Sequence, residues 1–182
     1  YDPPEKKKEF RPWDAKRRKK APPDPRPLYN QPGMATSKTV VLVEGEKCAQ
    51  TLIDIGIVAT TAMHGANAPV DKTDWSPFSG KSVVIWPDHD KPGSNYAMTA
   101  ADAVLAAGAT SCAVLLPPDD KPEGWDVADA IVEGFDVAGF IVRGPRLQMQ
   151  LPVDALVDGS ISGGASNPPA DGDNAVWGSE DA

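Results

Sequence analysis

The segment VVLVEGEKCAQTLIDIG, Val40–Gly56, changes its pattern from strand to helix within a few residues. Residues 39–44 are a continuous apolar run that ends at Glu44, which is typical of a strand covered on both faces. Residues 46–56 then carry apolar side chains at helical spacing, and Gly56 fits a C-terminal helix stop. An unpaired carboxylate at the end of a buried strand costs desolvation energy. Glu44 is therefore the first candidate for a functional residue.

Further strands and helices alternate after this segment. The pattern predicts strands over 57–63, 81–88 and 111–118, helices over 94–109, 125–134 and 135–144, and a loop over 64–80. This order predicts an α/β fold with a mainly parallel four-stranded sheet flanked by helices. In such sheets ligands bind beyond the carboxyl ends of the strands, which is where Glu44 is expected.

The chain divides into three parts by composition. Residues 1–37 form a basic, proline-rich lead-in, residues 38–144 one globular domain, and residues 145–182 a flexible linker or tail rich in Gly, Ser, Pro and Asp. Leu28 and Tyr29 are expected to pack on the body. Because the chain begins with Tyr1, we expect it to be a piece of a longer or processed protein.

Charge is distributed unevenly along the chain. The net charge is −8, yet residues 1–30 hold ten Lys and Arg against five Asp and Glu, so a basic arm precedes an acidic body. Such an arm is typical of contact with an anion such as nucleic acid, and equally of a solvated segment. No apolar run reaches membrane-spanning length, so we expect a cytoplasmic protein without a membrane partner.

Soft metal ligands are scattered. The two cysteines, Cys48 and Cys112, lie within apolar segments and suit a reducing compartment rather than a disulfide framework. Together with His64 and His89 they lack the spacing of a structural zinc site, so we do not expect such a site.

Carboxylates follow the third predicted strand, in IWPDHDKPG. Asp88 and Asp90 are two residues apart, so in an extended backbone both would point the same way and could join Glu44. Three clustered carboxylates repel one another unless a divalent cation neutralises them, and hard oxygen ligands favour Mg²⁺ or Mn²⁺. The alternative is a turn in which Asp90 caps the next helix.

Candidate nucleotide-binding or nucleic-acid-binding residues lie near the same predicted edge. They are Lys47, His64, Gly65, Lys72 and Lys91. Lys47 would open a helix whose N-terminus favours phosphate, and Gly65 would permit a close backbone approach to a nucleotide. A solvated lysine and a structural loop histidine remain alternatives for Lys47 and His64.

The stretches VVLVEGEKCAQTLIDIG, TTAMHGA and SVVIWPDHDKPGSNYAMTAADAV resemble the Toprim domain, and in detail its primase branch in phage and plasmid primase-helicases. The resemblance covers roughly residues 38–135. It implies that Glu44, Asp88 and Asp90 are catalytic and bind Mg²⁺. The stretch EGWDVADAI resembles a downstream family element, which implies that Asp126, and less firmly Asp129, also stands near the metals.

Two positions depart from the family pattern. Many relatives carry Asp where this chain has Cys48, which implies a more weakly held second metal, and Trp125 replaces an expected lysine. The family's zinc-binding module and the helicase GxxxxGK[ST] loop are absent from this sequence, so we expect both in other parts of the same protein.

The resemblance implies Mg²⁺-dependent RNA-primer synthesis from NTPs on a single-stranded DNA template, as in a DNA primase. Two alternatives remain. A nuclease of the same fold would hydrolyse nucleic acid with the same metals, and a non-catalytic module would bind nucleic acid or a replication partner without turnover.

Overall fold

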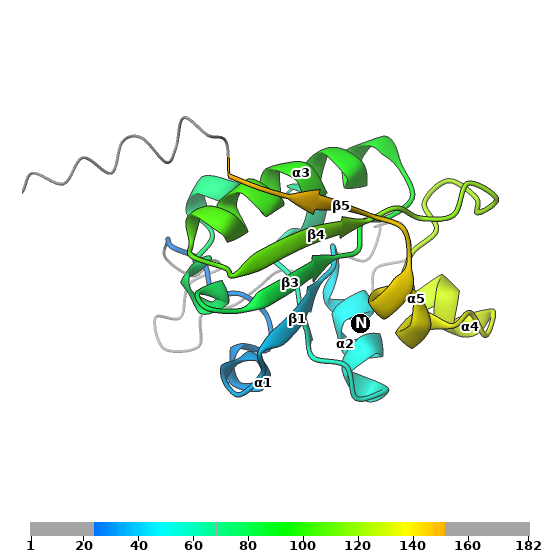
Figure 1. The fold of residues 1–182 in the computed structure, drawn as a ribbon, viewed down its shortest axis with the longest axis horizontal. Coiled ribbons are helices and arrows are strands. Elements are labelled where there is room, and N and C mark those ends of the chain that lie inside the picture. The colour runs from blue at the N-terminus through cyan, green and yellow to red at the C-terminus, as the bar shows by residue number, and fades with distance from the viewer. Residues whose placement is uncertain (1–23, 68, 152–182) are drawn as a thin grey trace, which may run out of the picture. The chain divides into compact units, whose positions relative to one another are not determined.

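A five-stranded sheet runs through residues 24–67 and 69–151, the part of the chain that the computed structural model describes (Figure 1). The strands are β1 (Thr39–Leu42), β2 (Ala59–Thr60), β3 (Ser82–Ile85), β4 (Ser111–Leu115) and β5 (Arg146–Met149). Their order is β2-β1-β3-β4-β5, and all neighbours are parallel except β4 and β5. The predicted α/β fold with a mainly parallel sheet is confirmed.

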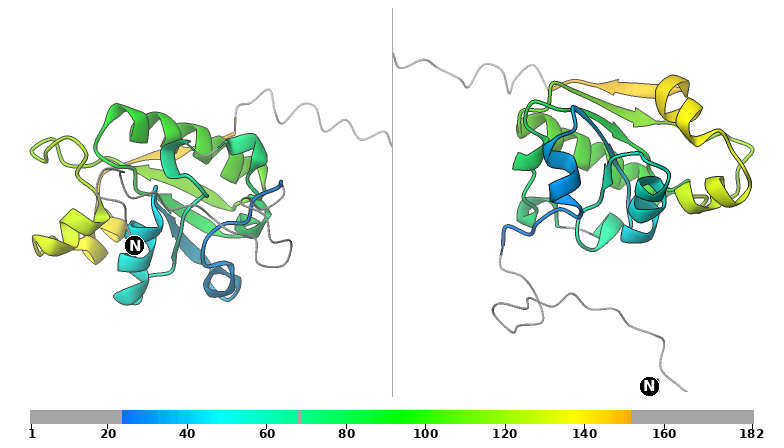
Figure 2. Two further views of the ribbon diagram at one scale, coloured as in Figure 1. Left: turned by 180° about the vertical axis from the view of Figure 1, so that it is seen from behind. Right: turned by 90° about the horizontal axis from the view of Figure 1, so that it is seen from below.

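Helices cover both faces of this sheet (Figures 1 and 2). They are α1 (Gln31–Ala35), α2 (Glu46–Asp54), α3 (Lys91–Ala106), α4 (Val127–Val132) and α5 (Val137–Arg143), with 3₁₀ turns at Gly65–Asn67, Val70–Lys72 and Ser76–Phe78. Alternate side chains along β1 and the residue that follows it face opposite sides of the sheet: Val40 and Leu42 pack with α1 and α3, whereas Val41 and Val43 pack with α2, α4 and α5. No helix within the described residues is long and apolar enough to cross a membrane.

The fifth strand corrects the predicted strand number and the start of the linker at residue 145. Arg146–Met149 pairs antiparallel with Cys112–Leu115 at the edge of the sheet. Its side chains are exposed or only half-buried, so the segment lacks the apolar run that reveals the other strands. Arg146 holds its start in place by donating to the carbonyl oxygens of Ile141 at 2.9 Å and Gly144 at 3.0 Å.

The end of the predicted lead-in packs against the body. Leu28 is buried, as expected, and Met34 of α1 is fully buried. The Lys81 ammonium donates to the carbonyl oxygens of Met34 at 2.8 Å and Ser37 at 2.7 Å. Compact structure therefore begins before residue 38. Residues 1–23 of the lead-in and 152–182 of the tail lie outside the described residues.

Candidate metal centre

Glu44 lies at the carboxyl end of β1, between the loops that follow β2 and β3. Its side chain is buried, and its Oε1 accepts a hydrogen bond from the Asp88 amide at 3.2 Å. Its backbone carbonyl accepts from the Thr61 hydroxyl at 2.7 Å. Gly65 has a positive φ of 57°, and a Cβ there would lie 2.6 Å from the Glu44 carbonyl oxygen. The close approach that Gly65 permits is thus to the chain's own backbone.

The start of α3 closes the other side of Glu44. A Cβ on Gly93 would collide with Glu44 Oε1, and would lie 2.6 Å from the Asp88 carbonyl oxygen and 3.0 Å from Asp90 Oδ1. Only glycine allows this helix to begin directly against the two carboxylates. The Pro-Gly pair after Asp90 is therefore part of the site as well as a turn signal.

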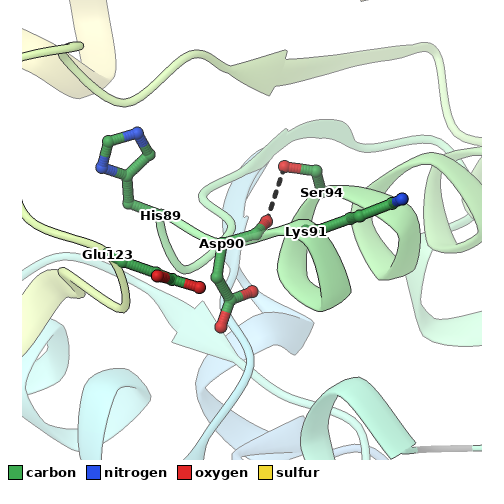
Figure 3. A pocket seen from close by; sticks show the side chains of 5 residues that line it. All are labelled: His89, Asp90, Lys91, Ser94 and Glu123. Carbon is green, nitrogen blue, oxygen red and sulfur yellow. Dashed lines mark hydrogen bonds between the residues drawn. The ribbon is translucent and has the colours of Figure 1, made fainter.

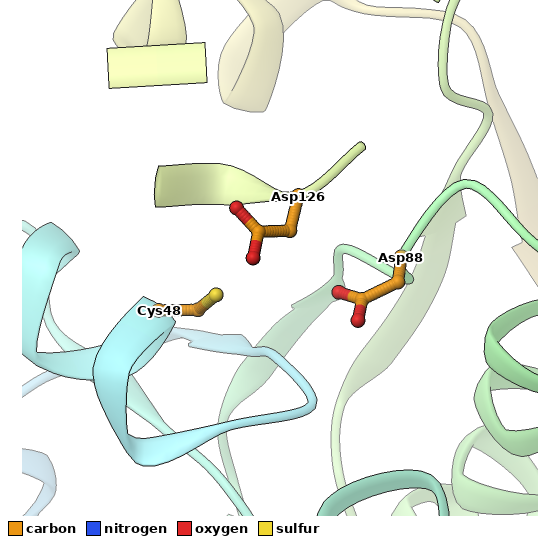
Figure 4. A group of neighbouring side chains, drawn as sticks. All are labelled: Cys48, Asp88 and Asp126. Carbon is orange, nitrogen blue, oxygen red and sulfur yellow. The ribbon is translucent and has the colours of Figure 1, made fainter. Parts of the chain in front are cut away.

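A second group of ligand atoms meets beside Glu44 (Figure 4). Cys48 Sγ comes from the first turn of α2, Asp88 follows β3, and Asp126 is the N-cap of α4. One atom from each of these side chains lies within 4.8 Å of the others. Cys48 is 5% exposed and both aspartates are half-buried. The sequence indicated Cys48 as a soft ligand without the spacing of a zinc site and as a departure from an expected acid, whereas the structure places its sulfur inside the group.

Asp90 adopts the alternative conformation considered from the sequence. Its Oδ1 accepts from the Gly93 amide at 2.6 Å and so caps α3. Its own amide donates to the Asp88 carbonyl at 2.8 Å, so the chain turns here instead of staying extended. The extended backbone that the i, i+2 argument assumed is therefore not what the structure has between Asp88 and Asp90. Asp90 lies at the rim of the site, next to Gly93.

Asp126 has a similar second role. Its side chain accepts from the Asp129 amide at 2.9 Å, and Asp129 accepts in return from the Asp126 amide at 3.4 Å. This capping box fixes the direction of Asp126 at the start of α4. Asp129, by contrast, is exposed.

The electrostatics of the group show the expected repulsion. Burial, and then the charges of Glu44 and Asp126, raise the pKa of Asp88 from 3.8 to about 7. Burial, and then the Asp126 carboxylate, raise the pKa of the Cys48 thiol from 9.0 to about 12. Without a cation, the site therefore favours protonated forms of both side chains.

This pKa shift predicts how stability depends on pH without metal. Between about pH 4 and pH 7, Asp88 is protonated in the folded protein but has lost its proton in the unfolded chain. We therefore expect Asp88 to lower the free energy of unfolding progressively as pH rises through this window, and by a constant amount above it. Denaturant titrations in the presence of a chelator measure the effect.

The matched variants are Asp88→Asn and Asp119→Asn, of which Asp119 is exposed. The first should remove this part of the pH dependence and the second should retain it. Identical profiles for wild type and Asp88→Asn would contradict the assigned pKa shift.

A pocket of about 490 Å³ adjoins Asp90 (Figure 3). Its lining residues are His89, Asp90, Lys91, Ser94 and Glu123. The His89 amide donates to the Trp125 carbonyl at 2.9 Å, and the Gly124 amide donates to the His89 carbonyl at 2.9 Å. These two bonds join the loops that carry Asp90 and Glu123, so both residues line the same pocket. No sequence signal pointed to Glu123, because its place at the pocket depends on how the two loops pack.

The other predicted basic and loop residues have separate surroundings. Lys47 is exposed on the first turn of α2, and His64 is exposed with a φ of 82°. The Lys72 ammonium lies 3.7 Å from an Asp24 oxygen, and Lys91 is exposed at the pocket. Their part in nucleotide or nucleic-acid binding stays a prediction.

Comparison with known proteins supports the fold. No family model matches the sequence, and no curated protein matches it. Among solved structures, the chain is similar to the Aquifex aeolicus primase, in a crystal structure of its zinc-binding and RNA polymerase domains. The TM-score is 0.51 at 21% sequence identity, and the match covers 64% of this chain and 28% of that one. This chain thus spans less than a third of that protein, and what the likeness shows is a primase-like fold.

Proposed function

We propose that this chain carries the metal-dependent nucleotidyl-transfer site of a DNA primase, which makes RNA primers on single-stranded DNA. One observation carries the proposal: Glu44, Asp88 and Asp126 converge, with Asp90 at the rim, beyond the carboxyl ends of a parallel sheet. The likeness of the fold to that of a primase supports the choice of reaction.

The side chains present fit a hard divalent cation. They offer carboxylate oxygens from separate elements, and their mutual repulsion contributes to raising the pKa of Asp88 to about 7. Mg²⁺ or Mn²⁺ held by Glu44, Asp88, Asp90 and Asp126 would lower the pKa of an attacking hydroxyl and neutralise charge on the phosphates.

The protein's own groups would position the reactants. Glu44 is buried, with one oxygen held by the Asp88 amide, and is the carboxylate best placed to accept a proton from the attacking hydroxyl. Lys91 and His89 line the adjoining pocket, where they could contact the phosphates of an incoming NTP. The His89 ring donates from Nδ1 to the Pro122 carbonyl at 3.1 Å, so Nε2 could donate to a phosphate oxygen in the imidazolium form of the ring.

The template would be bound in part by the basic arm. Ten Lys and Arg among residues 1–30 can neutralise template phosphates, whereas the rest of the chain has 21 acidic and eight basic residues. Helicase and zinc-binding modules would belong to other parts of the same protein. Lys47, Lys72, His64 and Gly65 remain candidates for further nucleic-acid contacts.

Incubation with labelled NTPs, single-stranded DNA and Mg²⁺ tests the proposal. Short RNA products that require template would support it. Degradation of the template would instead identify a nuclease with the same metals, and binding without either product would identify a non-catalytic module.

Metal binding itself gives a separate prediction. Mg²⁺ or Mn²⁺ should raise the melting temperature by several degrees, because the cation relieves carboxylate repulsion and binds only the folded site. Asp88→Asn should abolish most of this shift, whereas Asp119→Asn, which changes an exposed carboxylate, should retain it. Equal shifts in wild type and Asp88→Asn would place the metal elsewhere.

A further inference from the structure

A sulfur atom lies among the oxygen ligands of the candidate metal centre. Cys48 Sγ, an Asp88 oxygen and an Asp126 oxygen are within 4.8 Å of one another. We propose that these three residues bind a thiophilic divalent cation of the Zn²⁺ type, in preference to Mg²⁺. The inference goes beyond the proposed function: Glu44, Asp88 and Asp90 would hold a catalytic Mg²⁺, and the Zn²⁺-type cation would take a second position at Cys48 and Asp126 that shares Asp88.

The geometry suits one small cation. Zn²⁺ binds cysteine sulfur at about 2.3 Å and carboxylate oxygen at about 2.0–2.2 Å, so ligand atoms around it lie about 3–4 Å apart. Small side-chain rotations would bring the three observed atoms to this spacing. Figure 4 shows the three side chains directed toward one another from three separate elements. The fourth position would stay open to water or to Glu44.

The ligands are held before a cation arrives. Cys48 is fixed on the first turn of α2 and is almost fully buried. The capping box with Asp129 orients Asp126, and the Asp88 amide is bonded to Glu44. Ligands placed on rigid elements lose little freedom on binding, which favours affinity.

The chemistry of the donors sets the preference. A thiolate favours Zn²⁺ or Cd²⁺, whereas Mg²⁺ favours carboxylates, carbonyls and water. When the cation binds, a metal–sulfur bond forms and the thiol proton leaves for solvent, without any change of oxidation state. An aspartate at residue 48 would make the site entirely hard, so this one side chain decides which cation is preferred.

A buried hydroxyl also points to an occupant at this end of the sheet. Tyr96 is 5% exposed, and its hydroxyl has no hydrogen-bond partner among residues 24–67 and 69–151. Tyr96 follows Gly93 by one turn of α3, and a Cβ on Gly93 would meet Glu44 Oε1, so Tyr96 is on the side of α3 that faces Glu44. Buried hydroxyls are almost always hydrogen-bonded. A water bound to a cation beside Glu44 would supply the partner.

The other cysteine provides a matched control. Cys112 lies in β4 and is fully buried among the residues that pack against α3. Within the described part of the chain, the group of three potential ligands contains Cys48 and not Cys112. Replacing either cysteine by alanine removes one buried thiol, but only one replacement touches the proposed site.

The test is a titration of the full 182-residue chain with Cd²⁺, a spectroscopic probe for thiolate ligation. Wild type and Cys112→Ala should develop the ultraviolet thiolate-to-Cd²⁺ charge-transfer band with one equivalent, and Cys48→Ala should not. Zn²⁺ should remove the band by competition, and a large excess of Mg²⁺ should not. Cys48→Ala should bind Zn²⁺ more than about 100-fold more weakly, because loss of a direct ligand costs more than the roughly 10–100-fold lost with an outer partner of a ligand.

Cys48→Asp separates lost ligation from lost folding. It should remain folded, lose the band and bind Mg²⁺ more tightly than wild type does. A band that persists in Cys48→Ala, or wild-type binding of Cd²⁺ that Mg²⁺ displaces at equal concentration, would overturn the inference. Absence of primer synthesis by the wild type would defeat the proposed function and leave these spectroscopic results unchanged.

Discussion

Glu44→Gln is expected to lower nucleotidyl transfer by about 10²-fold or more, the usual scale for loss of a positioned acid or base. The amide oxygen of the introduced glutamine can still accept the hydrogen bond from the Asp88 amide, which Glu44 Oε1 now accepts at 3.2 Å. The variant would also lack the charge that contributes to the raised pKa of Asp88. Stability without metal should therefore be unchanged or higher.

The measurement combines primer-synthesis rates with denaturant unfolding in the presence of a chelator. Glu46→Gln is the matched control, because Glu46 is a carboxylate two residues further along that is not part of the buried group. It should leave both the rate and the stability near wild-type values. Full activity in Glu44→Gln, or a strong loss of its metal-free stability, would mean that Glu44 has a structural role.

The end of the sheet at which Glu44 and Asp88 meet was predictable from two sequence features. Val40–Glu44 reads as a buried strand that ends in a carboxylate, and Asp88 follows a second such strand. The structure makes β1 and β3 parallel neighbours, with Leu42 opposite Ile85 in register. Both carboxylates consequently emerge at the same edge, where the Asp88 amide reaches Glu44.

Other features of the site depended on packing between distant segments. Cys48 is four residues after Glu44, a spacing that places both near the start of α2, but its sulfur meets Asp126 only because α4 packs on α2. Glu123 lines the same pocket as Asp90 because backbone hydrogen bonds join their two loops. Neither contact follows from periodicity. The edge strand β5 was missed because its side chains lack an apolar pattern.

Trp125 stands where the family pattern has a lysine, and its packing in the structure explains this difference. Trp125 is 2% exposed and lies next to Asp126 in the chain. Its ring centroid is 5.8 Å from that of Trp86, which precedes Asp88 by two residues, and 5.3 Å from that of Phe135. Its Nε1 donates to Glu133 at 3.1 Å, and its carbonyl accepts from the His89 amide. At the position where the resemblance to the Toprim domain implies a lysine, this chain has a buried aromatic side chain between two loops of the site.

Trp125→Ala is therefore expected to lower the free energy of unfolding by about 3–5 kcal/mol, the usual cost of removing a large aromatic side chain from a core. It should also weaken metal binding by about 10–100-fold, because Asp126 and the loop at Asp88 lose their common support. Denaturant unfolding gives the first quantity. Metal titration below the unfolding transition gives the second.

Trp75→Ala separates the two effects. Trp75 is 8% exposed and stacks on Phe78 at a centroid distance of 6.0 Å, in the core on the α3 face of the sheet. Its removal should cost comparable stability, because a similar apolar surface is lost, yet leave metal affinity near that of wild type. If both variants weaken metal binding equally, metal affinity depends on the stability of the whole fold and not on the packing of Trp125. If Trp125→Ala binds metal normally, Asp126 is held in place by its capping box alone.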